Sequence, residues 1–126
     1  MDASETLVAR FSQLFPDAAV ECNSVEESSF FNRTFDAVLA WGLIFLLSAD
    51  AQRNLIGKVA RTLNPNGHFL FTSPKNSCSW TDGMTGLPSI SLGRNLYEQE
   101  LAANGLAVVG NDEDEGDNYY YFAMRL

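Results

Sequence analysis

The residues able to do acid–base or nucleophilic chemistry are few and widely spaced. His68 is the only histidine, so any Ser-His-Asp arrangement would have to use it. It follows Gly67 at the start of an apolar run that we expect to be a strand of a parallel sheet. Because ligands bind beyond the carboxyl ends of such strands, His68 would lie at the wrong end. The sequence therefore argues against a hydrolase.

An acidic run near the end of the chain is the one feature that could suggest a metal. It extends from Asp112 to Asp117 and includes Gly116. An EF-hand loop with Gly116 as its sixth residue would need a Glu where Phe122 stands. We interpret the run as the solvated turn of a hairpin. We predict no metal site and identify no catalytic base.

Composition and charge limit the class of protein. The chain has 126 residues, which fits one domain over residues 1–126, and 46% of them are hydrophobic. Its formal charge of -8 has the wrong sign for nucleic acid or an anionic membrane surface. Cys22 and Cys78 lack a CxxC spacing, so we expect two free thiols.

The chain also lacks a membrane or secretion signal. The apolar run Ala37 to Leu47 is shorter than the roughly 20 residues that span a bilayer. The start, Met1 to Glu5, carries acids where a secretory signal would be basic. We expect a cytoplasmic protein with no membrane contact.

Helical and strand patterns alternate along the chain. Apolar residues at helical spacing predict three helices, each with a capping residue before it or a breaker after it. The first contains Leu7 to Phe15 and follows Asp2 or Ser4, the second contains Leu55 to Leu63 and follows Ser48, and the third contains Leu92 to Leu101 and ends at Asn104-Gly105.

Between the helices, short apolar runs predict strands. They are Ala19 to Cys22, a strand beginning at Phe35 and covered on both faces, His68 to Thr72, Leu106 to Gly110, and Tyr119 to Met124. The segment Ser73 to Ser91 is rich in Gly, Ser, Pro and Thr, which predicts a long loop. Loops of this length in a compact domain are usually functional or disordered.

The connections predict how these strands pair. The strands at Phe35 and His68 are joined through a helix and should be adjacent and parallel. The last two strands should form an antiparallel hairpin, with the final strand beside His68 to Thr72. The predicted class is α/β, with a mixed, mostly parallel sheet and a C-terminal antiparallel hairpin.

A set of short motifs, taken in order, resembles a known family. They are Asp2-Ala3-Ser4 before a helix ending in Phe15-Pro16, the segment Phe35-Asp36-Ala37-Val38-Leu39-Ala40-Trp41-Gly42-Leu43, the turn Leu63-Asn64-Pro65-Asn66-Gly67, and Phe69-Leu70-Phe71. Their order and spacing resemble the Rossmann-like class I S-adenosylmethionine-dependent methyltransferases. The resemblance begins at the end of that family's second strand, so it implies the C-terminal portion of a methyltransferase-like fold.

The resemblance implies where the cofactor would bind. Asp2 matches the acid that accepts hydrogen bonds from the two ribose hydroxyls, a role suited to a carboxylate. Ser24 and Val25 match the positions at which the family binds the adenine. Trp41 and Gly42 match the positions that line the cleft beside the methionine portion of the cofactor. The alternatives are that Asp2 only caps a helix and that Trp41 is an aromatic anchor followed by a turn glycine.

The same resemblance implies a function and its alternative. Trp80, Asp82 and Thr85, with Cys78, lie on the loop that would cover a small-molecule acceptor of the methyl group. The family's first strand and Gly-rich turn have no counterpart here. We therefore expect this chain to bind S-adenosylmethionine weakly or not at all, with an affinity reduced about a hundredfold or more. The alternative is a non-catalytic relative that dimerises through an exposed sheet edge. A dehydrogenase is disfavoured because its glycine fingerprint is absent as well.

Overall fold

The computed structural model describes residues 1–126, in two compact units. The first is Met1–Asn32 and the second is Arg33–Leu126. The expected single-domain organisation over residues 1–126 stays a prediction. No helix is both long enough and apolar enough to cross a membrane, and Cys22 and Cys78 are free thiols, as expected.

The first unit contains the predicted amphipathic helix, α1 (Glu5–Leu14). Ser4 caps it, because its Oγ accepts a hydrogen bond from the Leu7 amide at 3.3 Å. The predicted strand Ala19 to Cys22 is wrong: only Cys22 pairs, through an isolated parallel bridge to Asp2. A single bridge supplies too few ladder hydrogen bonds to make this segment a strand. A short 3-10 turn, η1 (Phe30–Asn32), ends the unit.

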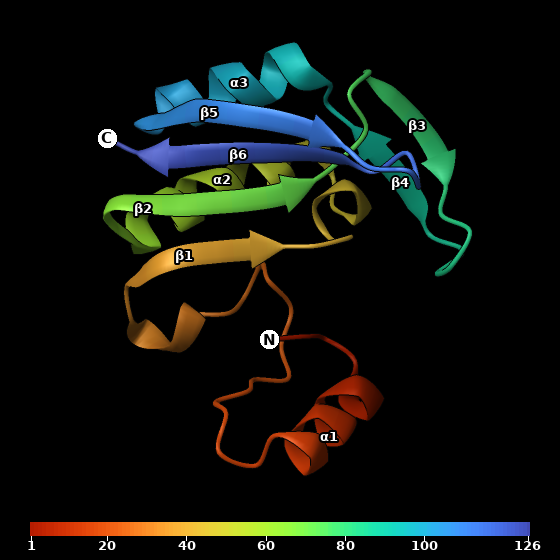
Figure 1. Cartoon of the computed structure of the whole chain (residues 1–126). Helices are drawn as coiled ribbons and strands as arrows, with labels where there is room; N and C mark the ends of the chain where they lie inside the picture. The colour runs from red at the N-terminus through yellow and green to blue at the C-terminus, as the bar shows by residue number, and fades with distance from the viewer. The chain divides into compact units, whose positions relative to one another are not determined.

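The second unit is built on a four-stranded sheet with the order β1-β2-β6-β5 (Figure 1). Its strands are β1 (Phe35–Ala40), β2 (Leu63–Thr72), β5 (Leu106–Glu113) and β6 (Tyr119–Arg125). As predicted, β1 is parallel to β2, β6 is antiparallel beside β2, and β5 and β6 form a hairpin. The expected mostly parallel sheet is wrong, because only the β1–β2 pair is joined by a helical crossover and runs parallel.

Two predicted helices, α2 (Ala49–Thr62) and α3 (Arg94–Ala103), accompany the sheet, and α2 lies behind it in Figure 1. The face of the sheet that they cover forms an aromatic core. Phe71 stacks on Tyr121 with ring centroids 4.7 Å apart and meets Tyr97 of α3 edge to face at 5.3 Å. All three rings are fully buried. Burying side chains of this size contributes roughly 1.5 to 3 kcal/mol each.

The expectation that the strand at Phe35 is covered on both faces is wrong. Strand β1 ends the sheet order, and Leu39 is 62% exposed. Leu39 pairs with Leu70, which pairs with Phe122, so these three side chains share one face. Both Leu39 and Phe122 are exposed, because the helices of this unit cover the opposite face.

The long loop predicted from Ser73 to Ser91 contains two short strands instead. They are β3 (Cys78–Thr81) and β4 (Pro88–Ser91), which pair antiparallel in a separate two-stranded sheet. Trp80 of β3 packs against Phe45 of the 3-10 turn η2 (Ile44–Leu46), with ring centroids 5.3 Å apart. This tertiary contact orders a stretch whose Gly, Ser and Pro content predicts a loop.

Candidate functional site

The carboxyl ends of the two parallel strands are joined by a hydrogen bond. Gly42, just beyond β1, donates its amide hydrogen to Oγ1 of Thr72 at the end of β2, at 2.8 Å. Gly42 has a φ of 59°, a left-handed conformation that favours glycine. A turn at this residue brings the amide to the neighbouring strand, so the two strand ends form one platform.

A buried hydrogen-bond network supports this platform. Ser73 Oγ lies 2.8 Å from the Tyr97 hydroxyl, which donates to Oε1 of Gln52 at 2.6 Å. The Gln52 amide nitrogen donates to the carbonyl oxygens of Leu47 and Ile90. Burial raises the pKa of Tyr97, so its hydroxyl stays protonated. The network connects α2, α3, β4 and the end of β2. Its polar groups are paired with one another, and burying them without partners would cost free energy.

The loop after β3 contributes a carboxylate. Asp82 Oδ2 accepts hydrogen bonds from the Thr85 amide at 2.8 Å and from the Thr85 hydroxyl at 2.7 Å. These bonds lower the pKa of Asp82, chiefly through the Thr85 hydroxyl. Asp82 is therefore ionised at neutral pH, and the turn that carries it has its own hydrogen bonds.

The acidic turn between β5 and β6 is organised by Asp114. Its carboxylate accepts hydrogen bonds from the backbone of Gly116, from Asn118 and from the Tyr120 hydroxyl. The bond from Tyr120 is the largest cause that lowers the pKa of Asp114 to about 2. Asp117, three residues after Asp114, has a φ of 60°, which Asp and Asn tolerate better than most residues.

These elements enclose a cavity of about 250 Å³ at the carboxyl end of β2. In Figure 1 the arrowheads of β1 and β2 point toward the side of the molecule where β3, β4 and the β5–β6 connection lie. The residues that line the cavity come from η2, the end of β2, β3 with its following loop, and the start of β6. They are Phe45, Thr72, Ser73, Pro74, Trp80, Asp82, Asp117, Asn118 and Tyr119.

The structure brings some predicted site residues of the second unit into this cavity. Trp80 and Asp82 line it, and Thr85 holds the Asp82 carboxylate. Trp41 and Gly42 are not among the lining residues. Trp41 is 58% exposed and packs against Tyr120, with ring centroids 5.4 Å apart.

Sequence reasoning missed the contribution of the acidic turn. Asp117, Asn118 and Tyr119 line the cavity, whereas the acidic run by itself predicts only a solvated turn. A signal was available, because the final strand was expected beside His68 to Thr72 and antiparallel to it. The turn before an antiparallel strand must lie at the carboxyl end of its parallel-sheet neighbour.

In the first unit, Asp2 lies at the end of a parallel bridge. Its amide donates to the Glu21 carbonyl oxygen at 3.1 Å, and its own carbonyl oxygen accepts from the Asn23 amide at 3.0 Å. Asp2 Oδ1 accepts a hydrogen bond from the Ser4 amide at 2.7 Å, whereas no bond to Oδ2 is present. Asp2 therefore helps to begin α1 and keeps one carboxylate oxygen for another donor.

The two other predicted residues of the first unit follow the same bridge. Ser24 comes two residues after Cys22, the partner of Asp2, and its Oγ accepts from the Glu27 amide at 3.3 Å. Val25 is buried. Because the bridge is parallel, the two segments run in the same direction through it. The residues that follow Asp2 and those that follow Cys22 therefore lie on the same side of the bridge.

A second, larger cavity of about 580 Å³ lies where the segment after β2 meets the start of α3. It is lined by Lys75, Asn76, Ser77, Leu92, Gly93, Arg94, Asn95, Leu96 and Glu98. Its size alone does not make it the site, because it contains none of the residues at the end of β2. Nowhere does the structure hold three or more His, Cys, Asp or Glu side chains grouped to bind a metal ion.

Solved structures of similar fold are methyltransferases. An S-adenosylmethionine-dependent methyltransferase from Clostridium acetobutylicum ATCC 824 has a TM-score of 0.78 and 11% identity, over 98% of this chain and 72% of that one. An amino pentose methyltransferase from Micromonospora echinaspora, involved in calicheamicin biosynthesis, has a TM-score of 0.75 and 14% identity, over 98% and 71%.

A third example is the 1,6-didemethyltoxoflavin-N1-methyltransferase of Burkholderia thailandensis, with a TM-score of 0.73 and 15% identity, over 93% of this chain and 55% of that one. At these identities the likeness shows the fold alone. No curated protein sequence matches the chain. The family model described as "Methyltransferase domain" matches residues 1–71, more than half of the chain. The chain therefore belongs to the S-adenosylmethionine-dependent methyltransferase family.

Proposed function

We propose that this protein transfers a methyl group from S-adenosylmethionine to a small-molecule acceptor, and that the 250 Å³ cavity at the end of β2 receives the acceptor. The position of that cavity carries the proposal, because open α/β sheets bind ligands beyond the carboxyl ends of their parallel strands. Two of the similar solved structures support a small acceptor, because one is an amino pentose methyltransferase and the other is a 1,6-didemethyltoxoflavin-N1-methyltransferase.

The residues of the first unit fit the nucleoside part of the cofactor. Asp2 has a carboxylate oxygen available for a diol, and Ser24 and Val25 follow the bridged partner at the same edge. We assign Asp2 to the ribose hydroxyls and Ser24 and Val25 to the adenine. When bound, the cofactor supplies an electrophilic methyl group.

In the second unit, Trp41 and Gly42 are assigned to the methionine part of the cofactor. Gly42 has nothing within 4 Å of the position a Cβ would occupy, so its backbone is open to a ligand. The exposed Trp41 ring offers an aromatic face to a sulfonium cation. The contribution expected of the chain is to position the acceptor, because proximity and orientation alone supply much of such a rate.

Calorimetry with S-adenosylmethionine tests the cofactor assignment. A hydrogen bond to a charged group contributes about 1.5 to 3 kcal/mol, so Asp2→Asn should weaken binding about tenfold or more. Asp17→Asn, which also removes an exposed acid of the first unit, is the matched control and should bind like the parent chain. If both variants bind the cofactor as well as the parent chain, the role of Asp2 is wrong. If the parent chain neither binds the cofactor nor transfers methyl groups, the proposed function is wrong.

A second candidate function is a non-catalytic assembly module. The observation in its favour is that β1 ends the sheet order and carries the exposed Leu39. An edge strand presents unpaired backbone groups that can pair with another chain. In this alternative the partner is a second copy of the chain, related by a twofold axis.

A further inference from the structure

Two acidic residues from separate elements line the cavity at the end of β2. Asp82 belongs to the loop after β3, and Asp117 belongs to the turn between β5 and β6. No Lys, Arg or His is among the lining residues. The lining therefore carries negative charge with no basic group to neutralise it.

Two basic residues from neighbouring segments of the chain line a different cavity. Lys75 and Arg94 line the larger cavity at the start of α3, and Arg94 Nε pairs with Glu98 Oε1 at 2.7 Å. The Thr85 hydrogen bonds keep Asp82 ionised, and both of them go to Oδ2, although an ionised carboxylate has about four lone-pair sites that can accept hydrogen bonds. Hydrogen-bonding capacity for a cationic donor is therefore available within the cavity.

Aromatic rings complete the lining. Phe45 and Trp80 pack together with their planes 45° apart, and Tyr119 lines the cavity as well. An aromatic face attracts a cation through its quadrupole, and this attraction strengthens when water is excluded. Aromatic surface also binds the planar or apolar body of a ligand. Carboxylates and aromatic rings in one small cavity favour a ligand with both properties.

We propose that the acceptor carries a cationic amino group attached to a planar or apolar body that fits the cavity of about 250 Å³. The proposal rests on the proposed function, because it names the class of molecule that the methyltransferase would receive. It concerns how the acceptor is recognised and leaves open which of its atoms receives the methyl group.

Three small probes of nearly equal shape test this proposal on the full chain without cofactor. They are tyramine, its neutral isostere 4-propylphenol, and the anion 3-(4-hydroxyphenyl)propionate. The chain has two tryptophans, so the indole N–H resonance of Trp80 reports on the cavity and that of Trp41 serves as an internal reference. Tyramine should shift the Trp80 resonance and bind about tenfold or more tightly than either other probe.

Charge-removing variants test the two acids. Asp82→Asn and Asp117→Asn should each weaken tyramine binding about threefold to tenfold, with little effect on 4-propylphenol. Asn tolerates the left-handed conformation of Asp117, and the Thr85 amide resonance shows whether the Asp82 turn remains intact. Asp112→Asn removes an acid of β5 that does not line the cavity, and it should bind tyramine like the parent chain.

Equal affinity for tyramine and 4-propylphenol would overturn the proposal, as would a Trp80 resonance that tyramine leaves unchanged. Loss of binding in Asp112→Asn equal to that in Asp82→Asn would also overturn it, because the effect would then be one of overall charge. Failure of the proposed function is seen separately, as absence of both cofactor binding in calorimetry and methyl transfer. Selective tyramine binding in that case would assign a cation site in a chain that is not an enzyme.

Discussion

At the scale of single residues, the Tyr97 hydroxyl has three partners in the buried hydrogen-bond network of the site. Its hydroxyl bonds Gln52 Oε1, lies 2.8 Å from Ser73 Oγ and accepts from the Leu92 amide at 3.2 Å. Removal of one atom therefore leaves several buried groups without a partner. A buried polar group that is left without a partner lowers the stability of the folded state by more than a single hydrogen bond raises it.

Tyr97→Phe should lower the free energy of unfolding by about 1 to 3 kcal/mol, measured by urea denaturation. The matched control is Tyr121→Phe. Tyr121 is just as buried, but its hydroxyl has one long bond of 3.3 Å to the Pro74 carbonyl oxygen. We expect a loss of at most about 1 kcal/mol there. Equal losses in the two variants would show that the network adds nothing beyond ordinary tyrosine burial.

The pair formed by Asp114 and Tyr120 predicts a pH dependence of the β5–β6 turn. The pKa of Asp114 falls from 3.8 to about 2 in the folded chain, so its contribution to stability is present above pH 3.8 and is lost as the pH falls to about 2. The pKa of Tyr120 rises from 10.0 to about 12, so its contribution is present below pH 10 and is lost as the pH rises through 12.

Carboxyl-resolved NMR titration checks this pair. Tyr120→Phe should raise the pKa of Asp114 toward 3.8, because the hydroxyl is the largest cause of the shift. Tyr119→Phe changes the adjacent tyrosine and should leave the Asp114 pKa where it is. An Asp114 pKa that is the same in Tyr120→Phe and in the parent chain would contradict the assignment.

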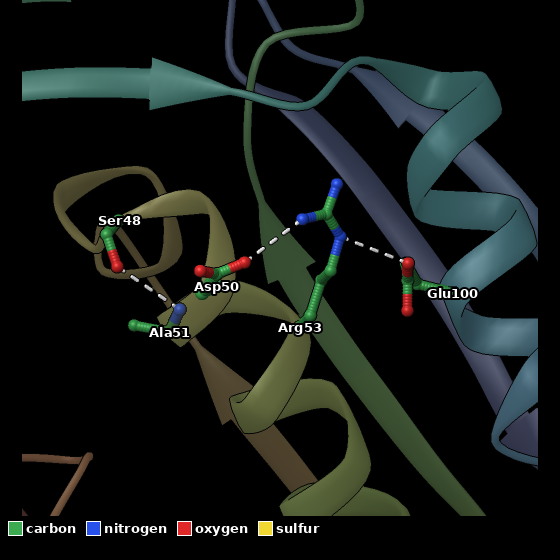
Figure 2. A network of polar contacts seen from close by, with 5 residues as sticks. All are labelled: Ser48, Asp50, Ala51, Arg53 and Glu100. Atoms are coloured by element: carbon green, nitrogen blue, oxygen red, sulfur yellow. Dashed lines mark hydrogen bonds and ion pairs between the residues drawn. The ribbon is translucent and has the colours of Figure 1, made fainter.

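At the scale of elements, the capping residue of α2 and the salt bridge from α2 to α3 are expected to contribute differently to the free energy of unfolding. Figure 2 shows Ser48 Oγ accepting from the Ala51 amide at 3.2 Å, and Arg53 contacting both Asp50 of α2 and Glu100 of α3. The Arg53–Glu100 pair is 3.1 Å long but partly exposed. Water screens such a pair, whereas a missing cap leaves a helix amide without its partner.

We therefore expect Ser48→Ala to cost about 0.5 to 2 kcal/mol of unfolding free energy, and Glu100→Gln less than about 1 kcal/mol. Urea denaturation at low and high salt distinguishes the two effects. Salt should reduce the small loss in Glu100→Gln and leave the loss in Ser48→Ala nearly unchanged. The reverse order of the two losses would make the bridge between α2 and α3 the stronger support.

Local signals predicted most helices and the pairing of the main sheet. Ser48 and Asn104-Gly105 mark helix ends through their own chemistry, and the crossover helix requires β1 and β2 to be parallel. The strands β3 and β4 were missed because Trp80 and Gln52 hold them through contacts with distant residues. The same reason applies to the candidate site: the resemblance predicts Trp80 and Asp82, whereas the place of Asp117 depends on the position of the hairpin against β2.

At the scale of the whole molecule, the exposed edge of β1 predicts a dimer. Sedimentation equilibrium at micromolar concentration should give a mass near twice 13.9 kDa. Leu39→Lys places a charge on the edge strand and should shift the mass toward that of one chain. Val109→Lys, an exposed position on the opposite edge strand β5, should leave the dimer intact. A single-chain mass for the parent protein, with the amides of Val38 to Ala40 protected from hydrogen exchange, would contradict the prediction.

The division between the platform and the lining of the cavity has an evolutionary consequence. The ends of β1 and β2 are fixed by the Gly42–Thr72 bond and by the buried groups around Tyr97. Asp82 and Asp117 lie instead on surface connections with their own local hydrogen bonds. Insertions and substitutions in surface connections cost little stability. Under the proposed function, descendants of this protein can therefore acquire new acceptors through changes in two loops, while the inherited framework beneath them stays unchanged.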